Sequence, residues 1–395
     1  MKYICILLIG LSFFAPCESS GQQLWPLHAN EWAMVSPDAQ GFSADTLLLT
    51  DQKILQGKYG YVDDVFITRN GQVIYQKKYH NDYRALYGAN AKEISGLNPF
   101  INGPYNYFDP WWHPFYRGGD LHTLQSVTKS VVSVTIGIAV ARQEFPDLST
   151  PVLNYFDISK VQNVDDRKKK MTIRDLITMT GGFEWEEWIP FDDPKNDCAG
   201  MEASFDWIKY TIDKPMVAQP GERFKYSSGG SQLLAYIFKA STGKDIEEYA
   251  SQYLFGPLGI KEWVWKRTPT GLPDTEGGLF LKASDLARIG YLFLRDGTWN
   301  GQRILTPEWI KDSVKPSASV SKSVKYGYKW WLIPYGNDRA KFVWACRGFG
   351  DQSMIIIPEY GIVAVFTAWN ISQESQAHLA TEATIKMVLN AITKK

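Results

Sequence analysis

The sequence predicts an α+β fold, in which an antiparallel sheet is built from both ends of the chain and flanked by helices. Short β-branched and aromatic runs occur near the N-terminus and again in the last third of the chain, whereas the middle carries helical patterns. Strands at both ends with helices between them imply a helical region inserted into one sheet. We divide the chain into a leader at 1–22, α/β parts at 23–125 and 281–395, and a mostly helical region at 126–280.

The first residues have the pattern of a secretory signal peptide. Lys2 precedes an apolar run over 4–14, and small and polar residues follow that run. The run is shorter than the roughly 20 apolar residues that span a bilayer as a helix. We therefore expect an exported protein, periplasmic or secreted, without a membrane span. A lipoprotein anchored at Cys17 is the minority alternative.

The composition is that of a globular protein and excludes some classes of function. Lys plus Arg and Asp plus Glu each number 42, so the chain lacks the basic excess of a nucleic-acid-binding protein. Four cysteines are too few for a disulfide scaffold in a chain of 395 residues. Cys198 and Cys346 remain after removal of the leader, and the sequence does not determine whether they pair.

The first strands and the helices have clear local signals. A hairpin is expected at 62–79, because Asn70-Gly71 separates two β-branched runs. Residues 84–120 are rich in Gly, Pro, Asn and aromatic residues without a period, which predicts a loop. A strongly apolar helix follows from Ser126 to about Gln143. Further helices are expected at 172–180, 231–241, 245–255, 284–296 and 306–314.

Two of these helices carry capping residues, and the last third returns to strands. Ser284 is expected to cap one helix, and Thr306 another that begins with Pro307. β-Branched and aromatic runs bounded by Gly, Pro and Asn predict the C-terminal strands. These strands are expected at 326–333, 341–346, 352–357 and 362–368, with a tight turn at 358–361 and a final helix at 377–392.

Ser126-Val127-Thr128-Lys129 opens the first long helix and is the strongest chemical motif. The i, i+3 spacing places the hydroxyl and the amine on one helical face. A serine is a weak nucleophile until a base takes its proton. Lys129 is a base only if its pKa falls, and we expect burial and the nearby positive end of the helix dipole to lower it. The helix start also offers free backbone N–H groups to an anion.

Two further segments offer groups for the same chemistry. Tyr226-Ser227-Ser228 precedes the helix at 231–241, and a phenol on such a loop passes protons if a neighbouring cation lowers its pKa. Cys346-Arg347-Gly348-Phe349 ends one expected strand, where glycine often marks the close approach of backbone to a ligand. A backbone N–H in this segment is placed to donate to an oxyanion.

These three motifs, in this order, resemble those of the serine β-lactamase and penicillin-binding-protein superfamily, whose signature is Ser-x-x-Lys, Tyr-x-Asn or Ser-x-Asn, and Lys-Thr-Gly. The resemblance is closest to its branch of esterases and 6-aminohexanoate-dimer hydrolases, related to class C β-lactamases. It covers nearly the whole chain from about residue 30. It implies a β-lactamase/transpeptidase-like fold. Segments that resemble the family lie at 121–133, 171–183, 220–233, 277–290 and 348–366.

The resemblance implies a role for each matching residue. Ser126 corresponds to the acylated nucleophile, Lys129 to its base, and Tyr226 to the group that passes a proton to the leaving group. The backbone N–H groups of Ser126 and Phe349 correspond to the oxyanion hole. Whether Lys129 or Tyr226 takes the serine proton stays open, because the two titrate as a coupled pair.

Two departures from the family pattern bear on the substrate. Ser228 stands where Asn is usual, and Cys346-Arg347-Gly348 stands where Lys-Thr-Gly would recognise a penicillin-type carboxylate. Arg347 either binds a carboxylate bidentately or faces solvent, because an arginine does not replace a lysine atom for atom. Ser228, Arg347 and Gly348 are our candidate substrate-binding residues in these motifs.

Two tryptophans and a histidine–aspartate pair are further candidates for the site. Trp185 and Trp188 flank a segment that by resemblance lies over the active-site mouth, and they either line an apolar substrate pocket or belong to the core. His122 and Asp120 lie close to Ser126 in sequence, but the members of a Ser-His-Asp triad come from distant segments, so a strand histidine is the preferred interpretation. The histidines show no metal-ligand spacing.

The function that follows is an exported serine hydrolase, an amidase or esterase that cleaves a small amide, ester or peptide-like substrate through an acyl-enzyme on Ser126. We expect no metal or organic cofactor and no nucleic-acid partner. One alternative is a β-lactamase or D-Ala-D-Ala carboxypeptidase. Another is a penicillin- or peptidoglycan-binding protein without turnover, which the changes at Ser228 and Cys346 motivate.

Overall fold

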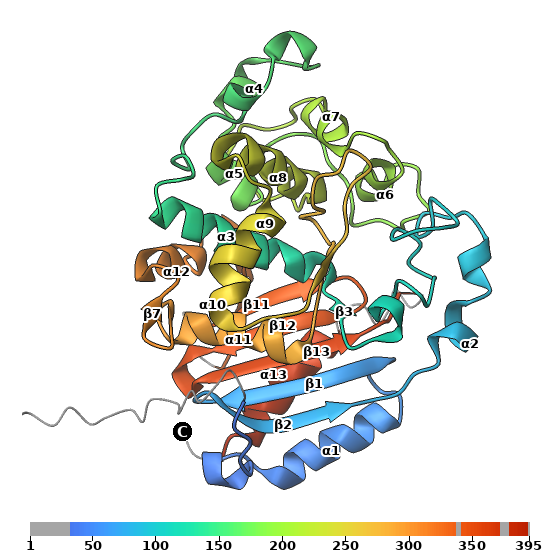
Figure 1. Cartoon of the computed structure of the whole chain (residues 1–395), viewed down its shortest axis with the longest axis vertical. Helices are drawn as coiled ribbons and strands as arrows, with labels where there is room; N and C mark the ends of the chain where they lie inside the picture. The colour runs from blue at the N-terminus through green and yellow to red at the C-terminus, as the bar shows by residue number, and fades with distance from the viewer. Residues whose placement is uncertain (1–31, 337–340, 372–378, 394–395) are drawn as a thin grey trace, which may run out of the picture.

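The computed structural model describes residues 32–336, 341–371 and 379–393, and the leader at 1–22 with Cys17 lies outside this part of the chain. An antiparallel sheet with helices on both faces forms one half of the molecule, and a mostly helical region forms the other (Figure 1). The sheet has eight strands in the order β2-β1-β13-β12-β11-β10-β9-β8. The first two strands and the last strand of the chain therefore lie next to one another.

The N-terminal hairpin is present as predicted. Strands β1 (Val62–Arg69) and β2 (Gln72–Lys78) pair antiparallel on either side of Asn70-Gly71. Both turn residues have positive φ, 49° and 79°, which is the conformation that an Asn-Gly hairpin turn requires.

The C-terminal strands join the hairpin in one sheet. β13 (Ile362–Ala368) pairs with β1 on one side and with β12 (Gln352–Ile357) on the other, and β12 pairs with β11 (Phe342–Gly348). The expectation of a sheet built from both chain ends is confirmed.

The prediction of a single strand at 326–333 is wrong. The structure has two strands there, β9 (Lys325–Tyr326) and β10 (Trp331–Pro334), which pair antiparallel. The chain reverses between them through Gly327, where a Cβ would lie 1.9 Å from the Ser313 carbonyl oxygen, and Lys329, whose φ is 63°. β8 (Ala318–Ser319) completes this edge of the sheet.

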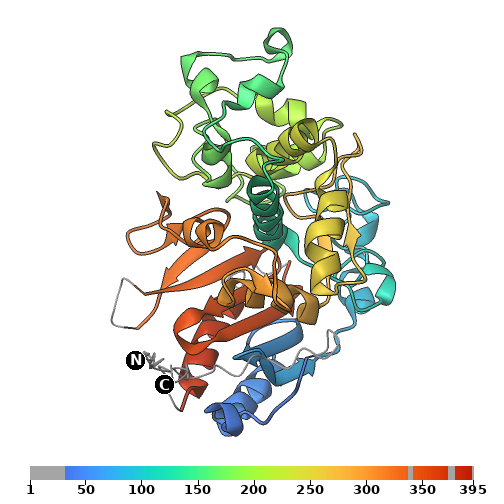
Figure 2. The ribbon, with the colours of Figure 1, turned by 60° about the vertical axis from the view of Figure 1, so that its left-hand side comes forward.

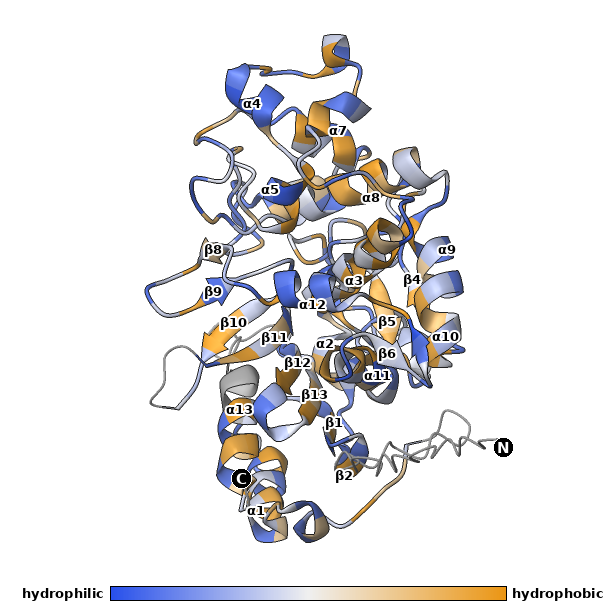
Figure 3. Ribbon diagram, turned by 90° about the vertical axis from the view of Figure 1, so that its left-hand side faces the viewer, coloured by the Kyte–Doolittle hydropathy of each residue, from blue (hydrophilic) through white to orange (hydrophobic). Residues whose placement is uncertain are grey.

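Alternation along the strands builds an apolar layer on each side of the sheet. Val65 and Ile67 of β1 pack with helices α1 (Ala44–Leu55) and α13 (Leu379–Ala391), whereas Phe66 faces the opposite side. α11 (Ala283–Leu294) covers that opposite side, so the sheet lies between helices (Figures 1 and 2). Apolar residues accordingly concentrate in β10, β12 and β13 (Figure 3).

Helix α3 (Thr128–Ala141) lies between the sheet and the upper helices (Figure 2). Twelve of its 14 residues are buried, which agrees with its nearly uninterrupted apolar sequence. The remaining helices are α2 (Tyr83–Tyr87), α4 (Asp166–Lys170), α5 (Ile173–Ile177), α6 (Asp197–Glu202), α7 (Trp207–Ile212), α8 (Ser228–Thr242), α9 (Ile246–Ala250), α10 (Gly256–Leu258) and α12 (Pro307–Ser313).

Short strands complete the described structure. β3 (His122–Thr123) and β4 (Val264–Trp265) both pair with β5 (Leu279–Leu281), and β6 (Thr298–Trp299) pairs with β7 (Gln302–Arg303). β3 leads directly into the turn before α3, while β5 follows the segment that contains Glu276. The small three-stranded sheet therefore brings these two segments together.

One of the two predicted helix caps is present in the structure. Thr306 caps α12, where its Oγ1 accepts the Trp309 N–H at 3.3 Å. Ser284 does not cap α11, because the helix starts one residue earlier, at Ala283, with Lys282 in the cap position. The carbonyl of Ser284 instead accepts the indole N–H of Trp32.

Candidate active site

Ser126 lies in a tight turn between strand β3 and helix α3. The turn is a single 3₁₀ turn, Gln125–Val127, in which Gln125 has φ 47°. The end of β11 lies against this turn, because a Cβ on Gly348 would come within 2.5 Å of the Leu124 carbonyl oxygen. The half-exposed Ser126 therefore sits where the start of α3 meets the third sequence motif.

Lys129 points back to Ser126 from the first turn of α3, and it is 1% exposed. Its Nζ donates to Ser126 Oγ at 2.7 Å, to Ser228 Oγ at 3.1 Å and to the carbonyl oxygen of Glu276 at 2.7 Å. Nζ also lies 3.3 Å from Glu276 Oε2, which makes a buried ion pair. The first and second sequence motifs therefore meet at one amine.

The expected lowering of the Lys129 pKa is wrong. Burial does lower this pKa, but the electrostatic effects of Tyr226, Glu276 and Glu187 raise it more, so the balance holds it above its ordinary value. The sequence showed that the amine would be buried, but it did not show that carboxylates would surround it. Lys129 in the resting site is an ammonium.

Tyr226 packs over this ammonium. Lys129 Nζ lies 5.1 Å from the centre of the Tyr226 ring, and the tyrosine is 8% exposed. Burial raises the pKa of Tyr226, the Lys129 charge opposes that rise, and hydrogen-bonding contact with Ser126 and Lys129 opposes it further. The net effect is a pKa above the ordinary value, so Tyr226 is a neutral phenol at neutral pH.

Glu187 is a carboxylate of the site that sequence reasoning missed. Its Oε2 accepts the Ser228 backbone N–H at 2.8 Å and the Trp185 indole N–H at 2.5 Å, and its Oε1 accepts the Ser228 hydroxyl at 3.1 Å. Burial raises its pKa, while the Lys129 charge lowers it less. Its segment, Glu184-Trp185-Glu186-Glu187, has no spacing that relates it to Ser126 or Tyr226.

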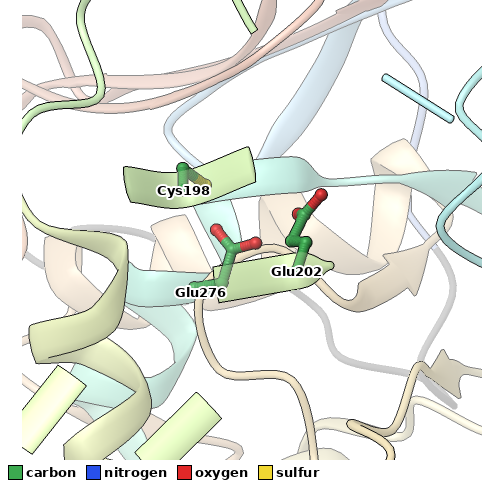
Figure 4. Close-up of side chains that lie close together, drawn as sticks. All are labelled: Cys198, Glu202 and Glu276. Atoms are coloured by element: carbon green, nitrogen blue, oxygen red, sulfur yellow. The ribbon is translucent and has the colours of Figure 1, made fainter. Parts of the chain in front are cut away.

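A second acidic group lies on the other side of Lys129. Glu276 and Glu202 lie close together beside Cys198, and one potential ligand atom from each residue lies within 4.8 Å of the others (Figure 4). Burial and then the Glu276 charge raise the pKa of Glu202 well above its usual range. The pKa of Glu276 is lowered, because Lys129 and a hydrogen bond from Glu202 outweigh burial. Glu202 is therefore a neutral acid that donates to anionic Glu276.

The same three side chains have the donor types of a metal site, but their charges are already balanced. Burial raises the pKa of Cys198 well above its ordinary value, so it is a neutral thiol. The Lys129 ammonium supplies the positive charge beside Glu276. We therefore assign no metal to this cluster.

The third motif runs along the end of β11. Cys346 is buried, and Arg347 places its guanidinium 5.5 Å from the Trp331 ring centre. Phe349 follows in the turn to β12, and its ring packs on Phe191 at 5.1 Å. The motif lies beside Ser126 as expected, while Cys198 and Cys346 are both free and buried.

The two candidate tryptophans have different surroundings. Trp188 is 60% exposed and stacks on Tyr226 with ring centres 6.0 Å apart, so it borders the site. Trp185 is 2% exposed, so its ring packs in the core while its N–H binds Glu187.

His122 and Asp120 do not join Ser126 in a triad. His122 lies in β3, as the strand interpretation predicts, and its Nε2 contacts Asp63 Oδ2 at 2.9 Å. Asp120 forms a salt bridge with Lys78. Among the described residues, no helix combines the length and hydropathy needed to cross a bilayer.

Comparisons with known proteins agree with this arrangement. A family model described as Beta-lactamase matches residues 64–384. A 6-aminohexanoate-dimer hydrolase of Paenarthrobacter ureafaciens is 25% identical over 282 residues, which are 65% of this chain and 69% of the relative. A putative D-alanyl-D-alanine carboxypeptidase of Escherichia coli K12 is 26% identical over 243 residues, 58% of this chain and 49% of that protein.

Solved structures share the fold. A putative 6-aminohexanoate-dimer hydrolase from Bacillus anthracis has a TM-score of 0.66 at 19% identity, covering 91% of this chain and 86% of the other. The hydrolase EstCE1, described as having promiscuous acyltransferase activity, has a TM-score of 0.64 at 14% identity, covering 91% and 98%. These likenesses confirm the predicted fold class.

Proposed function

Because the chain belongs to the beta-lactamase family, we propose that it is an exported serine hydrolase that cleaves a small amide or ester through an acyl-enzyme on Ser126. The observation that carries the proposal is the contact of Lys129 Nζ with Ser126 Oγ at 2.7 Å, under the ring of Tyr226. A hydroxyl, an amine and a phenol in contact with one another have the composition of an activated nucleophile.

The proposed reaction has two halves. Ser126 Oγ attacks the substrate carbonyl and loses its proton to the site, and the neutral phenol of Tyr226 donates a proton to the leaving group. Water then attacks the acyl-enzyme, and Ser126 regains its proton. Each half requires a group that gives a proton and a group that accepts one, within hydrogen-bond reach of the reacting atoms.

The negative charge that develops on the carbonyl oxygen needs fixed donors. We assign this role to the backbone N–H groups of Ser126 and Phe349. The close packing of Gly348 on the Leu124 carbonyl supports the assignment, because it holds the end of β11 beside the Ser126 turn. Losing one such donor costs hydrolases roughly 100- to 1000-fold in kcat.

The surroundings of the site bear on the substrate class. Trp188 extends the stacked rings of Tyr226 and Trp331, so an apolar acyl or leaving group has a surface to lie on. Arg347 packs over Trp331 at the same edge, beside Gly348, and we propose that these groups, with Ser228, border the bound substrate. The relative from Paenarthrobacter ureafaciens is by its name a hydrolase of a 6-aminohexanoate dimer, which supports a small amide as one candidate.

The test is labelling of Ser126 with a fluorophosphonate probe, followed by mass spectrometry of the modified peptide. We expect one labelled serine and hydrolysis of nitrophenyl esters, both lost in Ser126→Ala. The matched control is Ser130→Ala, one turn along α3, whose hydroxyl donates to the Lys329 carbonyl and not to the reacting group. Absence of label on the folded protein would reject the proposal.

A substrate panel separates the alternatives in the same experiment. Hydrolysis of nitrocefin would favour a β-lactamase, and release of D-alanine from a D-Ala-D-Ala peptide would favour a carboxypeptidase. Stable labelling by a penicillin without turnover of any ester or amide would favour a binding protein. Export is proposed from the leader at 1–22, and N-terminal sequencing of the protein from a fractionated host tests it.

A further inference from the structure

We infer that Glu187 is the final acceptor of the proton that Ser126 releases, reached through a relay of two side chains. This inference rests on the proposed hydrolase function and adds a residue to it that none of the three motifs contains. The relay atoms, in order, are Ser126 Oγ, Lys129 Nζ, Ser228 Oγ and Glu187 Oε1.

Each step of the relay is an existing hydrogen bond. Lys129 Nζ lies 2.7 Å from Ser126 Oγ and 3.1 Å from Ser228 Oγ. The Ser228 hydroxyl in turn donates to Glu187 Oε1 at 3.1 Å. The bonds from Lys129 to Ser228 and from Ser228 to Glu187 already point toward Glu187, so a proton moves along them without movement of the backbone. The bond between Lys129 and Ser126 runs from Nζ to Oγ, and it reverses once Nζ has lost a proton.

The site needs such an acceptor, because neither neighbour of Ser126 is ready to take a proton. Lys129 is an ammonium, since the surrounding negative charges raise its pKa. Tyr226 is a neutral phenol, since burial raises its pKa. A neutral phenol and an ammonium both donate protons well, but a base is still required.

The hydrogen bonds of Glu187 suit it to act as that base. Its Oε2 is already held by the Trp185 indole and the Ser228 backbone N–H, which leaves Oε1 for the Ser228 hydroxyl. Burial raises the pKa of Glu187, so its carboxylate is a stronger base than an exposed one.

Glu276 is the other carboxylate beside Lys129, and it is the poorer acceptor. Its Oε2 lies 3.3 Å from Lys129 Nζ, so distance alone does not exclude it. Its pKa is lowered, however, and it already accepts a proton from Glu202. Glu276 therefore holds Lys129 in place, while Glu187 takes the proton.

The hydroxyl of Ser228 gives a reason for the departure from the usual Asn. A hydroxyl accepts one hydrogen bond and donates another through the same oxygen, so it passes a proton on. An asparagine amide accepts through its oxygen but donates through a different atom, its nitrogen. The relay from Lys129 to Glu187 therefore requires Ser at this position.

The proton balance closes over acylation. A proton first passes from the Lys129 ammonium to Ser228 Oγ as the Ser228 proton passes to Glu187 Oε1, which leaves Lys129 as a neutral amine. The amine then turns its lone pair toward Ser126 Oγ and takes the serine proton, which makes it an ammonium again. The serine oxygen bonds to the carbonyl carbon while Glu187 becomes a neutral acid. On collapse of the adduct the bond to the leaving group breaks, and the leaving group takes the Tyr226 proton. Glu187 then restores the phenol through Ser228 and Lys129.

The pH dependence of the relay depends on several charged or titratable groups that face Glu187. They come from α3, α6, the loop before α8, the segment before β5, strand β9 and the turn after β9. These groups are Lys129, Cys198, Tyr226, Glu276, Tyr326 and Lys329.

The test compares Glu187→Gln with the matched control Glu186→Gln. Gln keeps the shape of Glu187 and an oxygen that accepts hydrogen bonds, but it takes no proton. Glu186 is the neighbouring carboxylate, and its side chain pairs with Lys225 rather than with Ser228. The acylation rate and kcat/KM for a nitrophenyl ester are measured from pH 4 to 9. The Tm of each variant is measured as well.

We expect Glu187→Gln to lose about 100-fold or more in kcat/KM, in line with general-base catalysis. The fall of kcat/KM at low pH (the acid limb of the pH profile) reports protonation of Glu187, so it should be absent from this variant. Glu186→Gln should keep both the rate and the limb. Glu187→Asp, which retains a carboxylate at a longer distance, should keep the limb and recover part of the rate.

Ser228→Ala breaks the relay without changing charge and tests it independently. The double variant Glu187→Gln with Ser228→Ala should be no slower than Ser228→Ala alone, because both changes interrupt one path. A wild-type rate and acid limb in Glu187→Gln, or additive losses in the double variant, would overturn the relay while Ser126 labelling still stands. Absence of Ser126 labelling in the wild type would instead overturn the hydrolase proposal.

Discussion

A buried ammonium between two carboxylates is held in place by charge as well as by packing. Lys129 lies between Glu276, on one side, and the pair of Ser228 and Glu187 on the other. Behind Glu276, the protonated Glu202 accepts the Tyr107 hydroxyl at 2.6 Å. The proton on Glu202 leaves Glu276 as the anion of that pair, and the Lys129 ammonium lies beside it. Burial without this balance would be strongly destabilising.

The proton on Glu202 leads to a prediction about stability and pH. The pKa of Glu202 in the folded protein lies above its ordinary value of 4.5. At a pH above 4.5 the unfolded chain has therefore lost this proton while the folded protein keeps it, so folding takes up a proton. The stability contributed by this proton is complete below the ordinary value of 4.5, and it is lost as the pH rises from there through the folded pKa. Glu202→Gln keeps a donor toward Glu276 without needing a proton, so it should become more stable relative to wild type by up to about 1.4 kcal/mol per pH unit above 4.5.

Urea unfolding of both proteins between pH 5 and 8 measures that difference. The matched control is Glu308→Gln at the exposed start of α12, which should show no such trend. A difference between Glu202→Gln and wild type that is constant with pH, or that shrinks as the pH rises, would contradict a protonated Glu202.

Sequence motifs located some of the contacts of Ser126 but not its acids. Lys129 is three residues from Ser126, and Tyr226 and Ser228 belong to a recognisable motif. Ser228 meets Glu187 across 41 residues, and Lys129 meets Glu276 across 147. Such pairings arise from tertiary folding, and no local spacing encodes them. The pKa of Lys129 was mispredicted for the same reason.

At the scale of elements, the meeting of β11 with the Ser126 turn sets the geometry of the proposed oxyanion hole. Gly348 allows this approach, because any Cβ there would lie 2.5 Å from the Leu124 carbonyl oxygen and 3.1 Å from Gln125 Cβ. Gly348→Ala should push the strand end away from the turn and lower kcat/KM by about 10- to 100-fold, since small displacements of catalytic donors are costly.

Kinetics and thermal unfolding of Gly348→Ala check this expectation. The control is Gly119→Ala, where φ is −85° and the nearest atom to the new Cβ lies at an ordinary 3.4 Å. That variant should retain wild-type activity. Unchanged kcat/KM in Gly348→Ala would show that the strand end does not position the reacting groups.

Elements were predictable from sequence where one signal dominated. The Asn70-Gly71 turn predicted the hairpin, and the apolar run after Ser126 predicted α3. α1 was not expected, because Leu48, Leu49 and Leu55 are all exposed and blur its apolar stripe. The turn between β9 and β10 was missed because Lys329 adopts a positive φ, which a lysine rarely does.

At the scale of the whole molecule, one apolar core joins the sheet to the helical region. The core that contains Phe238 of α8 also contains Ile356 of β12 and Val131 of α3. α3 therefore belongs to both halves, and the proposed division at 126–280 marks a change in secondary structure within a shared core. A core shared in this way ties the unfolding of one half to that of the other.

We therefore expect a single cooperative unfolding transition, although chains of this length often unfold in steps. Circular dichroism, tryptophan fluorescence and loss of activity should give the same Tm. Phe238→Ala and Ile356→Ala each create a cavity that costs about 2–5 kcal/mol, and both should lower that one Tm. Separate transitions, with Phe238→Ala shifting only one of them, would show that the helical region unfolds on its own. The two halves would then be independent domains, and Ser126 would lie at a boundary that opens before the protein unfolds.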